Sequence, residues 1–414
     1  MTSPSAIKWS TQQLQLLDQR ILPAQIEYLS YSEPFAVAEA IRNMVVRGAP
    51  AIGITAAYGM VLAAQQLTST PASVAAWCQA LSAARSALAN SRPTAVNLFW
   101  ALERCDRVIE EQGNGGNVLG ALTALAENIH AEDIKLNQRI GDFGASLIPA
   151  NSVVYTHCNA GALATGGYGT ALGVIRSAYR DGNIRGVIAG ETRPWLQGAR
   201  LTSWELMQDG IPVTLAIEGA AAHLMREQKP SWIIVGADRV AANGDAANKI
   251  GTYNLAIIAK YHGVKVMVAA PTSTFDANID GEQIPIEQRP GEEISHSFGQ
   301  RIAPENINIA NPAFDVTPAA LIDAIVTEHG IIHAPNRDKV LAHLRAAADS
   351  QKGREAAMID SKYFYQQAVD LAAAGDELYR RGGVPATSGN IPCRPNSKSS
   401  HLPPTRTPTG RPTP

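Results

Sequence analysis

The segment SVVYTHCNAGALATG, residues 152–166, predicts the fold of the larger part of this chain. A short apolar run, Val153–Tyr155, passes directly into Thr156-His157-Cys158-Asn159 and then into small residues and glycines. An uninterrupted apolar run that ends in turn residues is typical of a strand buried on both faces of a parallel sheet. The cysteine after this strand has four possible roles: core residue, metal ligand, half of a disulfide or reactive thiol.

Similar apolar runs recur downstream, with helical patterns between them. The runs lie at 186–189, 213–217, 232–235 and 264–269, and the helical patterns at 169–180, 202–208, 219–226 and 251–262. This alternation predicts an α/β fold in which residues 149–345 form a Rossmann-like, parallel-sheet domain.

The preceding residues, 1–148, predict a smaller, mainly helical domain. Alanine, leucine and valine recur there at helical spacing in five segments: Phe35–Val46, Ala49–Ala64, Pro71–Ala89, Thr94–Glu110 and Val118–Ser146. The first 30 residues predict a short strand or two, one of them at Ile26–Leu29.

The composition is that of a globular protein with a large core. Of 414 residues, 45% are hydrophobic and 17% are charged, and the formal net charge of -2 gives no reason to expect nucleic acid or an acidic membrane as a partner. No 18-residue apolar run and no secretory signal pattern is visible. The four cysteines have no CxxC spacing, which disfavours a zinc ribbon or a disulfide framework, so we expect a cytoplasmic location.

Polar clusters follow three of the predicted strands. Cys158 follows the first, Glu191-Thr192-Arg193 the second and Gly236–Arg239 the fourth. Strand ends are often polar, so one cluster would mean little. Because the carboxyl ends of parallel strands meet at one edge of the sheet, three clusters that include a cysteine, a glutamate and an aspartate favour a ligand site there.

Two arginine-containing turns precede predicted helices. Arg47-Gly48-Ala49-Pro50 places proline in the first turn of a helix, where backbone N–H groups and the guanidinium could hold a phosphate. A plain interhelical turn explains this pattern about equally well. Arg92, followed by Pro93, repeats the arrangement.

Asp238 ends an apolar strand and has two possible roles. It could cap a turn or pair with Arg239, or it could act as a general acid or base whose pKa is tuned by burial. Asn248-Lys249, just ahead of a helix, could hold an oxyanion or a hydroxyl. Gly166–Gly169 does not match GxGxxG, so nucleotide binding is disfavoured.

Six stretches, taken together, resemble the methylthioribose-1-phosphate isomerase family. This family belongs to a superfamily that includes regulatory subunits of translation initiation exchange factor 2B and ribose-1,5-bisphosphate isomerase. The resemblance covers roughly residues 7–340. The stretches are Arg47–Pro50, Ser91–Thr94, Thr156–Gly161, Glu191–Pro194 with Gln197-Gly198, Gly236–Arg239 and Asn248–Gly251.

The resemblance implies isomerisation of 5-methylthio-α-D-ribose 1-phosphate to 5-methylthio-D-ribulose 1-phosphate in methionine salvage. It implies a homodimer, a sugar phosphate as ligand, and neither a metal nor an organic cofactor. By the same resemblance Cys158 and Asp238 are the catalytic pair, with Asp238 an acid of raised pKa. The implied substrate contacts are Arg47, Gly48, Ala49, Arg92, Gln197, Asn248 and Lys249. Whether hydrogen moves as a proton or a hydride, and whether Cys158 is a base or a stabiliser, stays open.

Two alternatives remain within this superfamily. One is a ribose-1,5-bisphosphate isomerase, whose substrate would need a cationic pocket where a methylthio group needs an apolar one. The other is a non-catalytic regulatory protein, for which the cysteine, the aspartate and the arginine set would serve no purpose.

The C-terminal residues predict a separate arrangement. Residues 346–390 predict a helical extension, in which Leu371–Asn390 resembles the opening of methylthioribulose-1-phosphate dehydratase, an aldolase-like enzyme. Residues 391–414 are rich in Pro, Ser, Thr and Arg and predict a disordered tail. Our hypothesis is a truncated isomerase–dehydratase fusion, and the alternative is a helical extension with a tail.

Overall fold

The computed structural model describes residues 5–10, 12–93, 95–297 and 299–350. The chain divides into two compact units, Met1–Ala348 and Asp349–Pro414, and the two main parts of the fold belong to the first. The predicted dehydratase-like stretch and tail lie outside the described residues. Each described helix is too short or too polar to cross a lipid bilayer.

Helices dominate the first third of the described residues, and strands and helices alternate after it. The α-helices are α1 (Pro34–Arg42), α2 (Ala49–Gln65), α3 (Val74–Ala89), α4 (Val96–Gln112), α5 (Val118–Ala145), α6 (Ala171–Arg180), α7 (Ser203–Gln208), α8 (Ala221–Gln228), α9 (Thr252–His262) and α10 (Glu292–Ser295). Residues 337–350 are also helical. The strands are β1 (Ile7–Ser10), β2 (Gln13–Leu17), β3 (Tyr28–Tyr31), β4 (Ser152–Thr156), β5 (Ile184–Gly190), β6 (Val213–Ala216), β7 (Trp232–Val235), β8 (Arg239–Ala241), β9 (Ala246–Lys249), β10 (Lys265–Ala269), β11 (Phe275–Asp276), β12 (His296–Ser297), β13 (Gln300–Arg301), β14 (Phe314–Thr317), β15 (Ala324–Thr327) and β16 (Gly330–His333).

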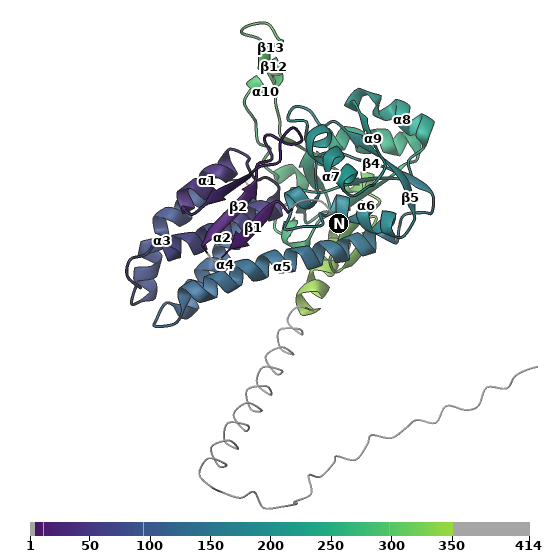
Figure 1. Cartoon of the computed structure of the whole chain (residues 1–414). Helices are drawn as coiled ribbons and strands as arrows, with labels where there is room; N and C mark the ends of the chain where they lie inside the picture. The colour runs from purple at the N-terminus through teal and green to yellow at the C-terminus, as the bar shows by residue number, and fades with distance from the viewer. Residues whose placement is uncertain (1–4, 11, 94, 298, 351–414) are drawn as a thin grey trace, which may run out of the picture. The chain divides into compact units, whose positions relative to one another are not determined.

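Helix α2 is the centre of the N-terminal part. Nearly all of its residues are apolar and buried, since α1, α3, α4 and α5 pack around it. The helical prediction is therefore confirmed. The first 31 residues hold more strand than predicted: β1, β2 and β3 form an antiparallel sheet. Trp9 of β1 stacks on Tyr58 of α2, with ring centroids 4.7 Å apart, so this sheet covers one side of the helices (Figure 1).

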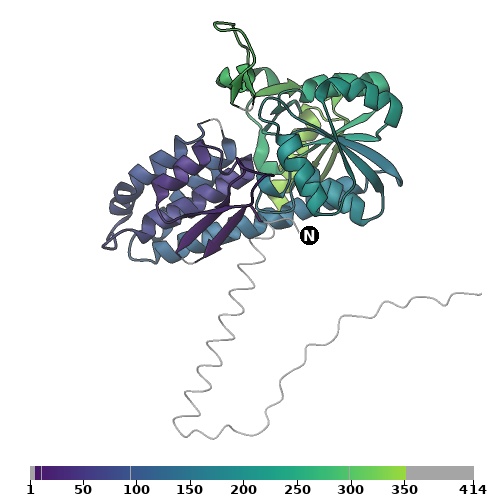
Figure 2. The ribbon, with the colours of Figure 1, turned by 45° about the horizontal axis from the view of Figure 1, so that its top comes forward.

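A seven-stranded sheet forms the C-terminal part. Its order is β16-β15-β10-β7-β4-β5-β6, and every neighbouring pair is parallel except β15 and β16. The predicted α/β fold with a parallel sheet is confirmed. The long helix α5 packs against both α2 and α6, and Figures 1 and 2 show it running from the helical part to the sheet. Both parts belong to one compact unit, so the predicted division at residue 148 stays a prediction.

A second sheet, in the order β11-β8-β9-β14, is absent from the sequence prediction. Its strands have two to four residues each, too few to show a period of alternation. This sheet matters for function because β8 begins directly after Asp238, and Asn248 and Lys249 are the last two residues of β9.

Candidate active site

The predicted site residues, which are far apart in the sequence, meet at two adjoining cavities. Both cavities are lined by Arg47, Gly48, Cys158 and Asp238. The remaining predicted residues line one or the other: Ala49, Arg92, Gln197, Asn248 and Lys249. Cys158, Gln197 and Asp238 follow the carboxyl ends of β4, β5 and β7, where ligands bind in open α/β sheets. Their individual roles stay predictions.

Cys158 lies just beyond the end of β4 in a left-handed backbone conformation, with φ +62°. Its N–H donates to Thr192 Oγ1 at 2.8 Å, and its carbonyl accepts a hydrogen bond from Thr202 Oγ1. A non-glycine residue in this region costs energy and persists only where its surroundings hold it. The two threonines provide that hold. Burial raises the pKa of the Cys158 thiol, although Arg47 and Lys249 act in the opposite direction.

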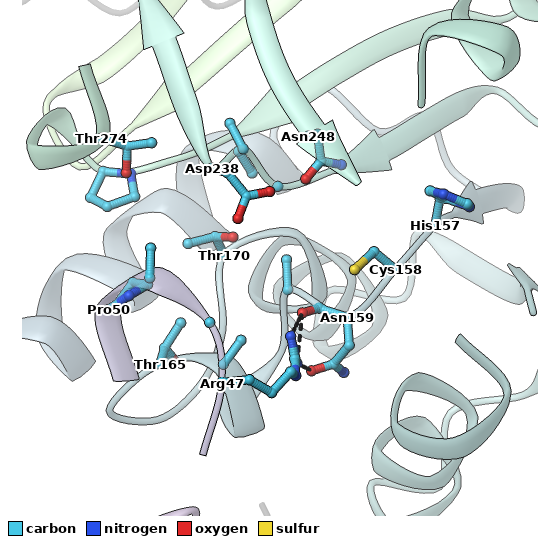
Figure 3. A pocket seen from close by; sticks show the side chains of 18 residues that line it. Arg47, Pro50, His157, Cys158, Asn159, Thr165, Thr170, Asp238, Asn248 and Thr274 are labelled. Atoms are coloured by element: carbon cyan, nitrogen blue, oxygen red, sulfur yellow. Dashed lines mark hydrogen bonds between the residues drawn. The ribbon is translucent and has the colours of Figure 1, made fainter. Parts of the chain in front are cut away.

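His157 points away from Cys158, as Figure 3 shows. Its Nε2 lies 2.8 Å from the carbonyl oxygen of Ile250, and burial lowers its pKa to about 4. The imidazole is therefore neutral at pH 7. Its hydrogen bond to Ile250 lies on the side away from Cys158. No Cys–His pair of the protease type forms between these two residues.

Asp238 connects β7 to β8, and its N–H donates to the carbonyl of Ala247 at 2.9 Å. Burial raises the pKa of its carboxyl group, while the nearby Lys249, Arg92 and Arg47 lower it. Figure 3 shows the carboxyl of Asp238 and the sulfur of Cys158 on two walls of one cavity. A carboxyl that stays protonated in such a cavity can serve as a general acid.

Arg47 and Gly48 form the wall contributed by the helical part. Of the five N–H donors of a guanidinium, that of Nε bonds Gln19 Oε1, one on Nη1 bonds the carbonyl of Asn159, and the two on Nη2 bond that carbonyl and Asn159 Oδ1. One Nη1 hydrogen remains for a ligand. Gly48 has φ +98°, and an added Cβ would lie 2.5 Å from the carbonyl oxygen of Ala164, so only glycine fits there.

Lys249 and Gln197 contribute polar groups to the second cavity. Lys249 Nζ donates to Ala313 O at 2.9 Å and lies 4.7 Å from the ring centroid of Phe314. The buried Oε1 of Gln197 has no hydrogen-bond partner among the described residues, so it is available to a ligand hydroxyl. Arg92 lies in the same cavity, 3.9 Å from a carboxylate oxygen of Glu287.

The chain departs from regular helix immediately after Gln197. Residues Gly198–Thr202 form one turn of π-helix, labelled η2, before α7 begins. An added Cβ on Gly198 would lie 1.7 Å from the carbonyl oxygen of Gly190 at the end of β5. The turn therefore packs closely against β5, which sets where the side chain of Gln197 enters the cavity.

Sequence analysis missed an apolar wall of the second cavity. Met44, Pro194, Trp195 and Phe314 line it together with the ion pair of Arg289 and Glu293. Pro194 and Trp195 are adjacent in the sequence, but nothing there brings them together with Met44 and Phe314, which come from another loop and from the unpredicted β14. Within the described residues no three His, Cys, Asp or Glu side chains are grouped as a metal site.

Comparison with known proteins places this chain in a family. Residues 45–334 match the model of the initiation factor 2 subunit family. Methylthioribose-1-phosphate isomerase of Thioalkalivibrio sulfidiphilus is 58% identical over 341 residues, which are 82% of this chain and 97% of the relative. The chain belongs to the methylthioribose-1-phosphate isomerase family.

One further curated relative and two solved structures are also similar to this chain. The isomerase of Alcanivorax borkumensis is 54% identical over 84% of this chain and 99% of its own length. The crystal structure of 5-methylthioribose 1-phosphate isomerase from Pyrococcus horikoshii superposes with a TM-score of 0.78 at 40% identity, over 84% of this chain and 97% of that one. A structure titled translation initiation factor eIF-2B, subunit delta, from A. fulgidus has a TM-score of 0.72 at 42% identity, over 82% and 100%.

Proposed function

We propose that this protein isomerises 5-methylthio-α-D-ribose 1-phosphate to 5-methylthio-D-ribulose 1-phosphate. The observation that carries the proposal is the pairing of a half-buried thiol and a half-buried carboxyl, Cys158 and Asp238, in one cavity with Arg47, Arg92 and Lys249. The family's relatives carry the name of this activity.

The phosphate of the substrate binds on the cationic side of the cavity. Arg47 offers its remaining Nη1 hydrogen, Arg92 and Lys249 add positive charge, and Gly48 lets the backbone approach closely. Because the phosphate stays attached through the reaction, its binding energy can position the sugar for the chemical step.

Asp238 acts as the acid in ring opening. A sugar locked as a glycosyl phosphate cannot open as a hemiacetal does, so the ring oxygen must receive a proton as the C1–O bond breaks. The raised pKa of Asp238 keeps a proton available for this. The hydrogen on C2 then moves to C1 while the C2 hydroxyl returns a proton to the Asp238 carboxylate, so that C1 is reduced, C2 is oxidised and no external oxidant is needed.

Cys158 remains a neutral thiol in this scheme. Its raised pKa disfavours a thiolate base and favours a thiol that stabilises charge on the reacting sugar. That assignment favours transfer of hydrogen from C2 as a hydride, since a hydride shift removes no proton from the C2 carbon.

The apolar wall distinguishes the two candidate sugar phosphates. Met44, Pro194, Trp195 and Phe314 suit a methylthio group, whereas a second phosphate at C5 would lose hydration there. Of the cations that line this cavity, Arg289 is already paired with Glu293, and we assign the other three to the phosphate on C1. The wall therefore supports the methylthio sugar over ribose 1,5-bisphosphate.

One assay tests the function, the substrate and the route. The full chain is incubated separately with methylthioribose 1-phosphate and ribose 1,5-bisphosphate, and products are followed by NMR. We expect the methylthio ketose, and deuterium placed at C2 to be retained at C1. Absence of the ketose would refute the activity and favour a regulatory protein. Preference for the bisphosphate would favour the alternative enzyme, and loss of deuterium to solvent would favour proton transfer.

We propose a homodimer as the working form. Helix α9 exposes Tyr253, Ile257 and Tyr261 at a spacing of four residues, an apolar stripe that a second copy would cover. Light scattering should give twice the chain mass. Tyr261→Asp should shift it toward the monomer, and an unchanged mass would place the interface elsewhere.

We propose a cytoplasmic location and no nucleic-acid partner, which the net charge of -2 supports. We also propose that Leu371–Asn390 is the remnant of a fused dehydratase. Translation of the downstream reading frames of the gene tests the fusion, because absence of a dehydratase-like frame would remove it.

A further inference from the structure

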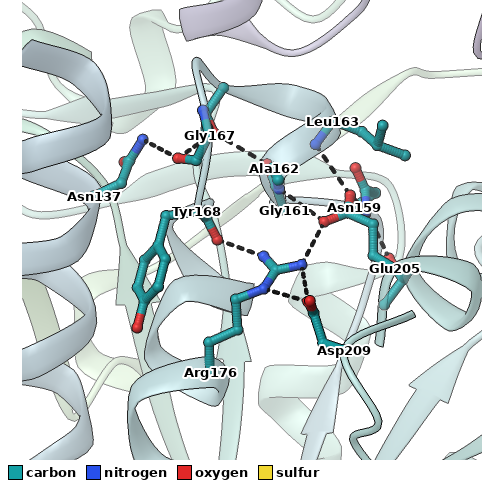
Figure 4. A network of polar contacts seen from close by, with 12 residues as sticks. Asn137, Asn159, Gly161, Ala162, Leu163, Gly167, Tyr168, Arg176, Glu205 and Asp209 are labelled. Atoms are coloured by element: carbon teal, nitrogen blue, oxygen red, sulfur yellow. Dashed lines mark hydrogen bonds and ion pairs between the residues drawn. The ribbon is translucent and has the colours of Figure 1, made fainter. Parts of the chain in front are cut away.

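A fully buried carboxylate, Glu205 of α7, is surrounded by donors from the loop that follows Cys158. Its Oε1 accepts from Asn159 Nδ2 at 2.9 Å and from the N–H of Leu163 at 3.1 Å, and its Oε2 accepts from the N–H of Ala162 at 2.8 Å. An added Cβ on Gly161 would lie 2.3 Å from Oε2, so the close approach requires glycine. Figure 4 shows this arrangement.

The side chain of Asn159 links Glu205 to Arg47. Its Nδ2 donates to Glu205, whereas its Oδ1 and its backbone carbonyl accept from the Arg47 guanidinium. An amide can be rotated to exchange its oxygen and nitrogen, and its neighbours decide which orientation is satisfied. Since an ionised carboxylate only accepts and a guanidinium only donates, Glu205 and Arg47 together allow one orientation.

We propose that Glu205 is a positioning residue for the isomerisation. By fixing the amide of Asn159 it holds the Arg47 guanidinium, and by binding two backbone N–H groups it holds the loop after Cys158. The phosphate-binding cation and the catalytic thiol are thereby aligned by one carboxylate that reaches neither of the two cavities. This inference rests on the proposed function at one point, where it takes the substrate phosphate as the ligand of Arg47.

A simpler explanation is that Glu205 only balances the charge of Arg176. Arg176 Nη2 lies 2.9 Å from Glu205 Oε2, but the same guanidinium also bonds Asp209 Oδ2 at 2.6–2.7 Å. Asp209 has no hydrogen bond to residues 159–163 in the described structure. Asp209→Asn is therefore a matched control, because it removes one buried negative charge from the same partner and leaves the loop bonds intact.

The experiment compares Glu205→Gln with Asp209→Asn in the full chain. It measures the Kd for inorganic phosphate by calorimetry, the alkylation rate of Cys158 by mass spectrometry, and kcat and KM. A glutamine must turn an N–H toward the donors that Glu205 accepts from. We expect kcat/KM to fall about 100-fold, phosphate affinity to weaken and Cys158 alkylation to change in Glu205→Gln, with all of them retained in Asp209→Asn.

A polarity swap separates positioning from general destabilisation. The double variant combines Glu205→Gln with Asn159→Asp. Its glutamine can donate to the new carboxylate at position 159, and that carboxylate still accepts from Arg47. Phosphate affinity should therefore recover in part. If Glu205→Gln does not accumulate as folded protein, Asn159→Ala removes the link while Glu205 and Arg176 stay paired, and it should also weaken phosphate binding.

Two results would overturn the proposal. One is a loss of thermal stability in Glu205→Gln and Asp209→Asn alike with phosphate Kd and kcat/KM unchanged. The other is unchanged phosphate affinity in Asn159→Ala. A wild-type chain that binds phosphate but forms no ketose would refute the proposed function alone, because phosphate binding and alkylation still test Glu205.

Discussion

The N–H of Cys158 donates a hydrogen bond to the hydroxyl of Thr192, at 2.8 Å, joining the segments that follow β4 and β5. The same hydroxyl donates to the carbonyl of Gly190 at 3.1 Å, so both of its roles are filled. The thiol is thus aimed by a neighbouring strand end rather than by the residues next to it in the sequence.

Thr192→Val removes the acceptor and keeps the shape of the side chain. A buried N–H left without a partner costs about 1–3 kcal/mol. Without this bond the backbone at Cys158 should relax from its left-handed conformation. We expect kcat to fall with KM nearly unchanged, because the groups that bind phosphate stay in place. Steady-state kinetics measure this, with Thr214→Val on the exposed face of β6 as control. A rise in KM alone would contradict it.

Cys158→Ser and Asp238→Asn test the catalytic pair directly. Each substitution keeps the size of the side chain, so folding should be unchanged by circular dichroism and thermal melting. Because loss of an acid or of a charge-stabilising group costs roughly 100-fold or more, most turnover should disappear. Near-normal isomerisation by either variant would remove that residue from the mechanism.

Gly198→Ala tests the contact between the π-turn and β5. The new Cβ would lie 1.7 Å from the carbonyl oxygen of Gly190, so the backbone must move and carry Gln197 with it. Overpacking of this kind costs about 1–3 kcal/mol or more. We expect a lower melting temperature and a lower kcat/KM. Gly186→Ala, on the same strand with nothing within 4 Å, should change neither, and equal effects in both would refute the argument.

Met44→Ala tests the apolar wall. Burying an apolar side chain is worth about 1.5–3 kcal/mol, so losing part of this contact should lower kcat/KM for methylthioribose 1-phosphate roughly tenfold. Inhibition by inorganic phosphate should change far less, because the Met44 side chain offers a phosphate no hydrogen-bond donor. Met207→Ala, on an exposed methionine, is the control. Equal weakening of phosphate inhibition would show that Met44 acts on the whole site.

The buried His157 predicts a pH dependence of stability. Its pKa is lowered to about 4 by burial, from 6.5, so between these values the unfolded chain binds a proton that the folded chain does not. Stability should fall as pH drops from 6.5 to 4, by up to about 3 kcal/mol. Asp133, with its pKa raised to about 7 by burial, acts in the opposite direction.

Comparison with His157→Gln isolates the histidine. Urea denaturation of both proteins between pH 4 and 7.5 should show a steeper loss of unfolding free energy in the wild type. Glutamine does not titrate, and its amide can still donate to the carbonyl of Ile250. Parallel pH curves for the two proteins would show that His157 titrates alike in the folded and unfolded states.

The fold was largely predictable because its main sheet is parallel and doubly covered. Strands such as Trp232–Val235 are buried on both faces, so they form continuous apolar runs between glycines and prolines. Cys158 and Asp238 were chosen as catalytic candidates for the same reason, since each comes shortly after such a run, and their catalytic roles stay predictions. The pattern of neighbouring residues was sufficient to predict a residue's place in the fold where that place depends only on the strand before it.

Roles that depend on distant partners were not predictable. Glu205 lies in a short helix whose sequence, SWELMQ, gives no sign that its carboxylate binds a loop more than 40 residues earlier. The second sheet was missed because its strands are stabilised by pairing with one another rather than by alternation. Thr192 and Asn159 lay within the quoted motifs, but only their geometry distinguished them.

The close contact between Gly48 and Ala164 links binding of the ligand to the stability of the protein. The cavity wall contributed by the helices and the wall contributed by the sheet meet at this contact, so any separation of the two parts destroys the site. A sugar phosphate held by Arg47 on one wall and Lys249 on the other is then a tie between them. Unfolding, and proteolysis through the unfolded chain, should therefore become less favourable as the concentration of the sugar phosphate rises above its Kd.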